Sequence, residues 1–331
     1  MRSSREDRSN LGAGLLVPRL NEGNQPIISA DYHIAAAPCS WGVNFSDHPG
    51  NPAWTQVLDE TASAGFTAID LGPVGFMPTD PVRLSAELAA RSLSISAGGL
   101  FDPLTDEHAF PAIVEKTRRS CELLRALGAP RFVIIDDISE ARGKTAGRSA
   151  AAVRLDPTAW AALMSRITEL AHIARDDYGV AAFLHPHAGS YIEFEDEIAR
   201  AMEELPEELV GLCVDTGHSV YSGLDPVGLI RQYGSRVGHM HFKNVDARVL
   251  AACIADGTDF FSAVSRGVFS LLDNGVVDFV SVRDALSAIG YSGFAVVEQD
   301  VDPKGQASPL ENAQSNFRFL ASIATQPTTN S

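Results

Sequence analysis

The chain is poor in cysteine, and its cysteines lack the spacing of a metal-binding or disulfide-rich module. Cys39, Cys121, Cys213 and Cys253 are scattered over 331 residues and form no C-x-x-C pair. This scarcity argues against a disulfide framework and against a zinc ribbon. We expect reduced, mostly buried thiols in a cytoplasmic protein, with Cys213 acting as a small hydrophobic residue inside an apolar run.

Positive charge and long hydrophobic runs are also scarce. The chain has 26 Lys and Arg against 42 Asp and Glu, a formal net charge of −16. A surface this acidic repels phosphate backbones and anionic membranes, so neither nucleic acid nor a membrane is an expected partner. The apolar stretch at 11–17 is short and contains two glycines, which predicts neither a signal peptide nor a membrane span.

The sequence does contain a regular alternation of short apolar runs and helix-like patterns. The strand-like runs are 33–38, 67–72, 93–99, 131–137, 180–186, 210–215, 237–242 and 294–299. Continuous apolar runs are typical of parallel strands buried on both faces. Several intervening helical patterns end in glycine, a common C-cap. Eight such units predict an α/β fold, a (β/α)8 barrel. The alternative, a doubly wound sheet, lacks a Gly-rich fingerprint after the first strand.

The domain organisation follows from this alternation. We expect a flexible N-terminal arm at 1–30, a single barrel domain at 31–324 and a flexible tail at 325–331. An insertion at about 246–278 separates the last two strands. Long segments after barrel strands usually line or cover the active-site mouth.

Imidazole and carboxylate side chains end the last four predicted strands. They are His185, Asp215, His241 and Glu298. Strand ends converge in a barrel, so these groups predict a metal site with oxygen and nitrogen ligands.

Each of these residues also has a structural alternative that the sequence leaves open. Asp215 could cap a helix, and Glu298 could pair with Lys243 or Arg318. Pro186 could simply end its strand and leave His185 solvated. His239, one layer deeper than His241, is better explained as a core histidine.

Further residues near these strand ends could contact a substrate or move protons. His187, His218 and Lys243 are candidates for proton transfer and substrate binding. Trp41 and Phe76, after the first two strands, could form walls of a small-molecule pocket. The structural alternatives are that His187 is solvated, that Lys243 is a surface residue, and that Trp41 and Phe76 only pack at the rim of the barrel.

Several motifs resemble a known family. They are CSWG (39–42), GFTAIDLGPVGFMP (65–78), HPHAGSYIE (185–193), CVDTGHSVYSGLDP (213–226), GHMHFKNV (238–245), GVFSLLDNGVVDF (267–279) and VVEQDVDP (296–303). The chain resembles the inosose dehydratases, within the xylose-isomerase-like superfamily of sugar isomerase/epimerase TIM barrels, over roughly 33–322.

The resemblance implies one divalent metal ion, Mn²⁺ or Co²⁺ first, with Mg²⁺ or Zn²⁺ as alternatives. The usual ligands are Glu, Asp, His and Glu, and Asp215, His241 and Glu298 match the last three. His185 stands where most relatives have glutamate. Either His185 is a ligand, or Glu193 approaches the site and contacts metal or substrate, or water completes the shell. Asn244 also replaces a common aspartate.

The resulting hypothesis is metal-dependent dehydration of a keto-polyol, such as 2-keto-myo-inositol, through an enediolate. Glu298 or His187 would be the general base, and a protonated His187, His218 or Lys243 would assist departure of the hydroxyl group. The nearest alternative is a sugar isomerase or epimerase, which reprotonates the same intermediate. A lyase acting on an oxidised glycoside and a non-catalytic barrel are further alternatives, and a homo-oligomer is compatible with all of them.

Overall fold

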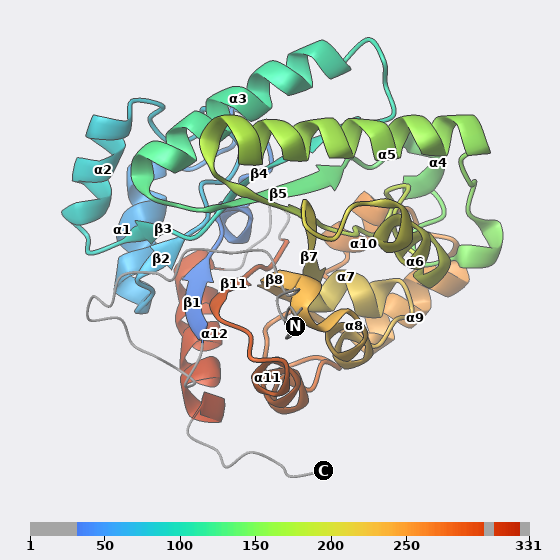
Figure 1. The fold of residues 1–331 in the computed structure, drawn as a ribbon. Helices are drawn as coiled ribbons and strands as arrows, with labels where there is room; N and C mark the ends of the chain where they lie inside the picture. Colours follow the sequence, from blue (N-terminus) through green and yellow to red (C-terminus); the bar gives the residue numbers. More distant parts are fainter. Residues whose placement is uncertain (1–31, 301–307, 325–331) are drawn as a thin grey trace, which may run out of the picture.

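The computed structural model describes residues 32–300 and 308–324, which form a parallel β-barrel surrounded by helices (Figure 1). The predicted arm and tail lie outside these residues. The sheet order is β3 (Ser94–Ile95), β2 (Ala68–Ile69), β1 (Tyr32–Ala36), β11 (Gly293–Val297), β8 (Val237–Phe242), β7 (Val210–Asp215), β6 (Ala181–Leu184), β5 (Arg131–Asp136) and β4 (Gly98–Asp102). All neighbours in it are parallel. The predicted (β/α)8 barrel is confirmed.

The barrel closes through one interrupted strand. The two ends of the sheet order, β3 and β4, are separated in the chain only by Ser96 and Ala97. These residues still bond to the neighbouring segment, because Ser96 N–H donates to Ile69 O at 3.0 Å and Leu71 N–H donates to Ala97 O at 2.8 Å. The predicted strand at 93–99 is therefore observed as two short strands. At Gly99 a Cβ would lie 2.6 Å from Val133 O, so only glycine permits this close approach.

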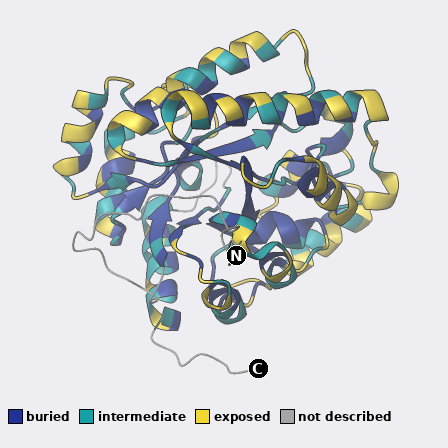
Figure 2. Cartoon of the chain, in the orientation of Figure 1, coloured by how far each residue is buried: buried dark blue, intermediate teal, exposed yellow. Residues whose placement is uncertain are grey.

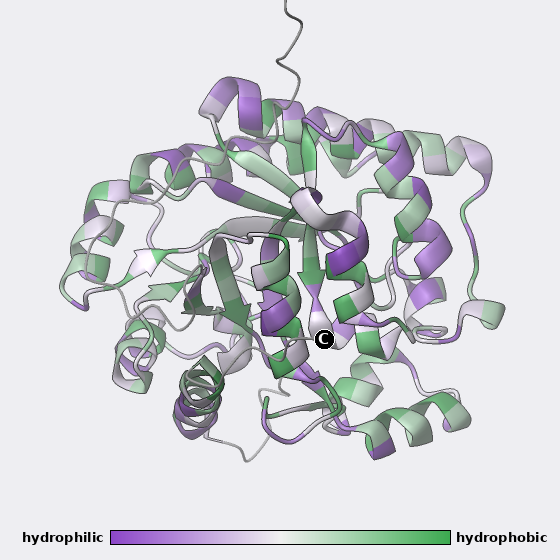
Figure 3. Cartoon of the chain, turned by 60° about the horizontal axis from the view of Figure 1, so that its bottom comes forward, coloured by the Kyte–Doolittle hydropathy of each residue, from purple (hydrophilic) through white to green (hydrophobic). Residues whose placement is uncertain are grey.

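The strands form the buried centre of the molecule, and the helices expose their outer faces (Figure 2). Every residue of β7 and β11 is buried, as expected for parallel strands covered on both sides. Along the outer helices hydrophobic and hydrophilic residues alternate (Figure 3). Hydrophobic burial against the barrel thus accounts for the position of the helices.

The larger helices are α1 (Trp54–Ala64), α2 (Pro81–Ala89), α3 (Phe110–Leu127), α5 (Pro157–His172), α6 (Glu195–Glu204), α8 (Pro226–Tyr233), α11 (Phe279–Ala288) and α12 (Pro309–Ala324). Shorter elements are η1 (Pro38–Trp41), α4 (Glu140–Gly143), η2 (Ser149–Ala151), α7 (Thr216–Tyr221), η4 (Gly234–Arg236) and the π-helical turn η3 (Ile173–Asp177) that continues α5. An aspartate side chain caps α2, α5 and α8, and proline follows it. Gly65 and Gly128 end α1 and α3 in the left-handed conformation, as the sequence predicts.

The insertion after β8 builds a small layer beside the carboxyl end of the barrel. It contains α9 (Ala247–Asp256), α10 (Phe260–Ser265) and β10 (Phe269–Ser270), which pairs antiparallel with β9 (Asn244–Val245). Its apolar residues pack on Ala188 and Tyr221, from the segments that follow β6 and β7. The insertion therefore lies close to the strand ends that carry the predicted site.

None of the helices within the described ranges has the length and apolar character needed to cross a membrane.

Candidate active site and metal centre

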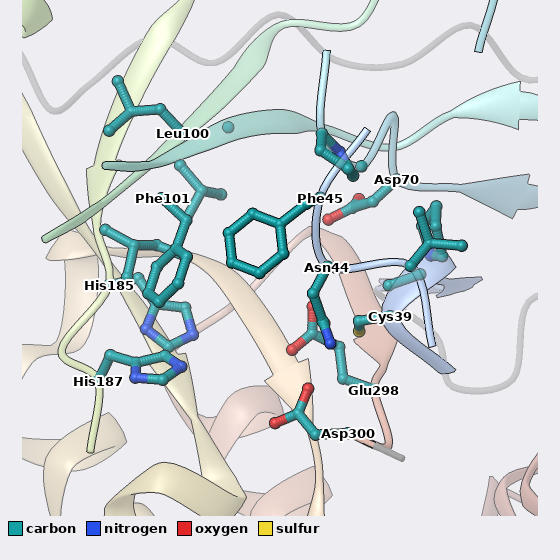
Figure 4. Close-up of a pocket in the computed structure, with 18 of the residues that line it drawn as sticks. Cys39, Asn44, Phe45, Asp70, Leu100, Phe101, His185, His187, Glu298 and Asp300 are labelled. Atoms are coloured by element: carbon teal, nitrogen blue, oxygen red, sulfur yellow. The ribbon is translucent and has the colours of Figure 1, made fainter. Parts of the chain in front are cut away.

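A cavity of about 410 Å³ lies at the carboxyl ends of the barrel strands (Figure 4). Its reactive lining residues are Asp70, His185, His187, His241, Lys243, Glu298 and Asp300. Apolar lining residues include Phe45, Phe101, Ile138, Phe260, Phe261 and Val264. The cavity thus combines titratable groups with an aromatic wall, as small-molecule sites commonly do.

The four predicted metal ligands meet at this end of the barrel. His185 follows β6, Asp215 ends β7, His241 lies in β8 and Glu298 follows β11. Asp215 Oδ2 lies 3.7 Å from His185 Nε2 and 3.9 Å from His241 Nδ1, and Glu298 Oε2 lies 3.3 Å from that same Nδ1. Ligand atoms of Asp215, His241 and Glu298 all lie within 4.8 Å of one another. The register of the parallel strands produces this convergence, since Asp215 pairs directly with His241.

Asp215 combines the two roles that the sequence left open. Its Oδ1 caps α7 by accepting the His218 N–H at 2.8 Å, while its Oδ2 is buried without a hydrogen-bond partner. Burial alone would raise the pKa of Asp215, but the charge of Lys243 and contact with His185 hold it below its usual range. A buried, ionised oxygen without a hydrogen bond is the state that a metal ion would stabilise.

Other ligand atoms in this group are unsatisfied as well. His185 Nδ1 and both ring nitrogens of His241 are buried without hydrogen bonds. Burial alone would raise the pKa of Glu298, but His241 and Lys243 hold it well below its usual value, so Glu298 is a carboxylate. Cys213 lies near His185 and His241, but burial raises the pKa of its thiol. The donor set is therefore mainly carboxylate and imidazole, which suits a divalent transition-metal ion.

Asp70 faces the other side of His241. Its Oδ2 lies 3.8 Å from His241 Nε2, and Ser96 Oγ donates a short hydrogen bond to its Oδ1. Burial raises the pKa of Asp70 to about 7 despite these contacts. His239 also approaches Asp70, at 4.0 Å, and burial lowers the pKa of His239 well below its usual value. His239 is a buried, neutral core residue, although neither of its ring nitrogens forms the hydrogen bond expected for one.

Lys243 is a buried ammonium group at the centre of the site. Its Nζ lies 2.8 Å from Asp300 Oδ2, 3.2 Å from Glu298 Oε2 and 3.5 Å from Asp215 Oδ2. Burial alone would lower its pKa, but Asp215, Asp300 and Glu298 raise it well above the usual value. The surface-lysine alternative is therefore wrong, and the predicted pairing of Glu298 with Lys243 coexists with its contact to His241.

His218 and His187 lie beside this lysine and are both neutral. Burial and neighbouring positive groups lower the pKa of His218 well below its usual value. His218 Nε2 accepts a hydrogen bond from Lys243 Nζ at 3.0 Å, and His218 does not line the cavity. The His218 nitrogen nearest Lys243 is therefore already occupied by a hydrogen bond, and the expected contact of His218 with substrate stays a prediction.

His187 is poised as an acceptor of protons rather than a donor. Its ring lies 3.7 Å from that of His218 and 5.4 Å from that of Phe101, centroid to centroid. Burial first, and then nearby cations, lower its pKa to about 3. Its Nδ1 lies 2.9 Å from Ala188 O, and a carbonyl only accepts, so the proton is on Nδ1 and Nε2 carries the lone pair. The low pKa favours the neutral form of His187 over the protonated form, and its role as a base stays a prediction.

Three predicted substrate contacts are not cavity residues. Glu193 is fully buried and bonded through both oxygens, to Gly147 N, Gly189 N, Ser222 Oγ and Arg142. Both of its oxygens are therefore already hydrogen-bonded within the protein, and Glu193 does not line the cavity. Trp41 is buried and donates to Glu60 Oε2 at 2.7 Å, and Phe76 is buried in the main core. Both belong to packing outside the cavity.

Asp70 and Asp300 line the cavity but were not predicted from the sequence. Asp70 ends the apolar run TAID, the same signal that identified Asp215, and Asp300 stands two residues after Glu298. Strand-end position alone could have found both. Phe45, Phe101 and Phe261 had no comparable signal, because an aromatic side chain after a strand is as common in packing as in a pocket.

A family model described as xylose isomerase-like TIM barrel matches residues 58–323. The chain belongs to this family. Among xylose isomerase-like relatives, it is 34% identical over 293 residues to the rhizopine catabolism protein MocC of Rhizobium meliloti, covering 88% of each chain. It is 31% identical to the inosose dehydratase of Geobacillus kaustophilus, covering 82% of this chain and 88% of the relative. The resemblance to inosose dehydratases is confirmed.

Solved xylose isomerase-like structures share the fold. The IolI protein with a bound zinc atom matches with a TM-score of 0.68 and 15% identity, covering 90% of this chain and 100% of that one. D-allulose 3-epimerase from Methylomonas, in complex with D-allulose, matches with a TM-score of 0.64 and 18% identity over 88% and 97%. At these identities the likeness supports the barrel architecture alone.

Proposed function

We propose that this protein is a metal-dependent dehydratase, a carbon–oxygen lyase, that acts on an inosose such as 2-keto-myo-inositol. The observation that carries the proposal is the convergence of Asp215, His241 and Glu298 beside the buried ammonium of Lys243. The curated relatives named inosose dehydratase, at about 30% identity over most of the chain, support the same reaction.

Asp215, His241 and Glu298 would hold the divalent ion, with His185 as the fourth protein ligand. Asp215 Oδ2 and His241 Nδ1 are both buried without hydrogen bonds and lie 3.9 Å apart, which supports a shared ion between them. Mn²⁺ or Co²⁺ suits this mixed donor set best, and Mg²⁺ and Zn²⁺ are the alternatives. When bound, the ion supplies Lewis-acid stabilisation of negative charge on the substrate oxygens.

The residues around the ligands provide the base and the acid. Nε2 of His187 removes the proton from the carbon next to the ketone, since Nδ1 carries the ring proton and Nε2 the lone pair. The electrons of that C–H bond form the enolate, which then expels the hydroxyl group on the next carbon. Lys243 donates the proton that lets this group leave as water, because it is the positively charged donor beside the carboxylates.

His218 and Asp300 orient the lysine. The Lys243 ammonium donates to His218 Nε2 and to Asp300 Oδ2, so two of its three N–H bonds are fixed by the protein. Glu298 Oε2 lies 3.2 Å from the same Nζ and lines the cavity, so the third N–H would be shared between this carboxylate and the substrate. This placement of an acid favours loss of water over simple reprotonation, which is the step that distinguishes a dehydratase from an epimerase.

The direct test uses the purified full-length protein, stripped with a chelator and reloaded with Mn²⁺ or Co²⁺. With 2-keto-myo-inositol, the loaded protein is expected to produce the ultraviolet absorbance of an unsaturated or dione product, and the stripped protein none. Asp215→Asn should abolish both metal retention and product formation. Persistence of the substrate with every metal would make the dehydratase proposal wrong.

A further inference from the structure

We infer that the preferred substrate carries an apolar group, at least as large as an aromatic ring, on its polyol ring. This inference rests on the proposed function, which it extends from a reaction to a substrate class. It comes from a part of the cavity that the proposed chemistry does not use.

The cavity has two parts of opposite chemical character. The floor contains the titratable groups, among them His185, His241, Lys243 and Glu298. The rest of the lining is mainly apolar and contains Phe45, Phe101, Ile138, Phe260, Phe261 and Val264, beside a smaller polar part made of Asn44, Ser46, Asp47 and Lys116. A volume of about 410 Å³ lies in the range of drug-sized ligands rather than of a single small ring.

The aromatic wall has unusual exposure for apolar residues. Phe45, in the segment between η1 and α1, is 54% exposed, and Phe261, in α10 of the insertion, is 56% exposed. Both line the same cavity although they lie more than 200 positions apart in the chain. Large apolar surfaces left in water beside a reaction site usually mark the position of a ligand.

The wall is continuous with the reactive floor through His187. The His187 ring lies 5.4 Å from the Phe101 ring and 5.4 Å from the Phe260 ring, centroid to centroid. Figure 4 shows Phe45 and Phe101 in the same pocket as His185, His187 and Glu298. A group attached to a substrate ring on the floor would therefore extend directly onto the aromatic wall.

An unsubstituted polyol does not match the apolar side chains of the wall. Its hydroxyl groups need hydrogen-bond partners, and burying them against phenylalanine and valine side chains would cost free energy. An aryl or benzyl group, in contrast, would remove apolar area from water on both sides. The substituent is thus the occupant that matches the chemistry of the wall.

Binding can be measured without turnover, using two unreactive ligands. We expect Mn²⁺-loaded protein to bind a mono-O-benzyl ether of scyllo-inositol at least ~10-fold more tightly than scyllo-inositol itself, as burial of one aromatic ring predicts. Isothermal calorimetry gives both dissociation constants. Equal affinities, or exclusion of the ether, would overturn the inference.

Substitutions in the aromatic wall test whether its side chains cause the preference for the ether. Phe45→Ala and Phe261→Ala should each lower the ether-to-parent affinity ratio by about 3- to 10-fold. Val82→Ala removes a 78% exposed side chain that does not line the cavity, and should leave the ratio unchanged. A ratio that falls equally in all three variants would contradict the assignment.

Turnover separates this inference from the proposed function. If 2-keto-myo-inositol is dehydrated but its benzyl ether is neither bound nor converted, the substrate class is wrong and the function stands. If neither ketone is converted but the ether of inositol still binds more tightly, the reaction is wrong and the two-part site stands. If sedimentation instead shows a dimer that Phe261→Ala dissociates, with no preference for the ether, a second copy covers the wall and the inference fails.

Discussion

At the scale of single residues, the site depends on side chains that serve two purposes at once. Asp215 is the clearest case, because Oδ1 begins a helix and Oδ2 faces the histidines. The cap fixes the orientation of the carboxylate, so its second oxygen has a defined position beside the histidines. Preorganised ligands lose little freedom on binding, so in the proposed metal site the helix cap would contribute to metal affinity.

His187→Ala should separate base catalysis from metal binding. We expect kcat to fall by about 100-fold or more with little change in metal affinity, because His187 acts on the substrate through Nε2 and is outside the ligand set. Steady-state kinetics and a Mn²⁺ titration give the two quantities. His241→Ala is the matched comparison and should lose metal affinity first. Loss of metal from the His187 variant would assign it to the ligand set instead.

Asp70→Asn should weaken metal binding without removing a ligand. The Asp70 carboxylate faces Nε2 of His241, while Nδ1 of that ring faces Asp215 and Glu298. Carboxylates behind ligand histidines typically contribute about 10- to 100-fold in metal affinity, and we expect a loss in that range. A Co²⁺ titration followed by visible absorption measures it. Ser96→Ala, which removes the donor to Asp70, should have a smaller effect in the same direction, and unchanged affinity in both variants would contradict the role.

At the scale of elements, the segments after β5 and β6 are held together by a buried charge cluster. Arg142 in α4 is fully buried and bonds to Glu193 and to Glu197, and Arg154 also pairs with Glu197. Glu193 in turn accepts from the backbone N–H of Gly189, two residues after His187. The cluster therefore positions the segment that carries His185 and His187.

Arg142→Met should destabilise the fold by about 3–5 kcal/mol, because it leaves buried carboxylates without their partner. Urea unfolding followed by circular dichroism measures the change. Adding Glu193→Gln should recover part of the loss, since it removes one of the unpaired charges. Lys144→Met is a useful control, because its ion pair with Glu140 is exposed and should contribute little. Similar effects from Arg142→Met and Lys144→Met would show that the cluster does not stabilise these segments.

Much of the element order was predictable, because each barrel strand is a continuous apolar run. The exceptions have physical causes. The run at 93–99 breaks in two at Ser96 and Ala97, and β9 and β10 are two-residue strands that carry no periodicity. Among the site residues, the strand-end groups were predictable from the barrel geometry. The position of Glu193 was not predictable, since it depends on hydrogen bonds from loop backbone N–H groups, those of Gly147 and Gly189.

At the scale of the whole molecule, the closed barrel brings residues that are far apart in the sequence together in one site. Asp70 and Asp300 are 230 positions apart and yet line the same cavity. The same closure explains why the aromatic wall escaped prediction. Phe45 and Phe261 come from long connections whose course depends on packing against other segments, which no local pattern specifies.

The stability of the molecule should fall as pH rises through the range of one buried carboxyl group. Burial raises the pKa of Asp136 from 3.8 to about 7, in spite of hydrogen bonds from the backbone of Tyr191 and Leu104. Between these values the folded state binds a proton that the unfolded state has released. The contribution of Asp136 to the free energy of unfolding therefore decreases as pH rises from about 4 to about 7.

Asp136→Asn should remove this part of the pH dependence. As pH rises from 5 to 8, the free energy of unfolding of the variant is expected to increase relative to that of the parent protein. Urea unfolding of metal-free protein at each pH gives the values. Parallel pH profiles for the two proteins would contradict the shifted pKa.

The most direct test of the central claim is the reaction of the Mn²⁺-loaded protein with 2-keto-myo-inositol in D₂O, followed by mass spectrometry. We predict a product that has lost one molecule of water relative to the substrate, formed only when metal is present. A substrate that gains deuterium but keeps all its oxygen atoms would contradict dehydration and assign the protein to isomerase or epimerase chemistry.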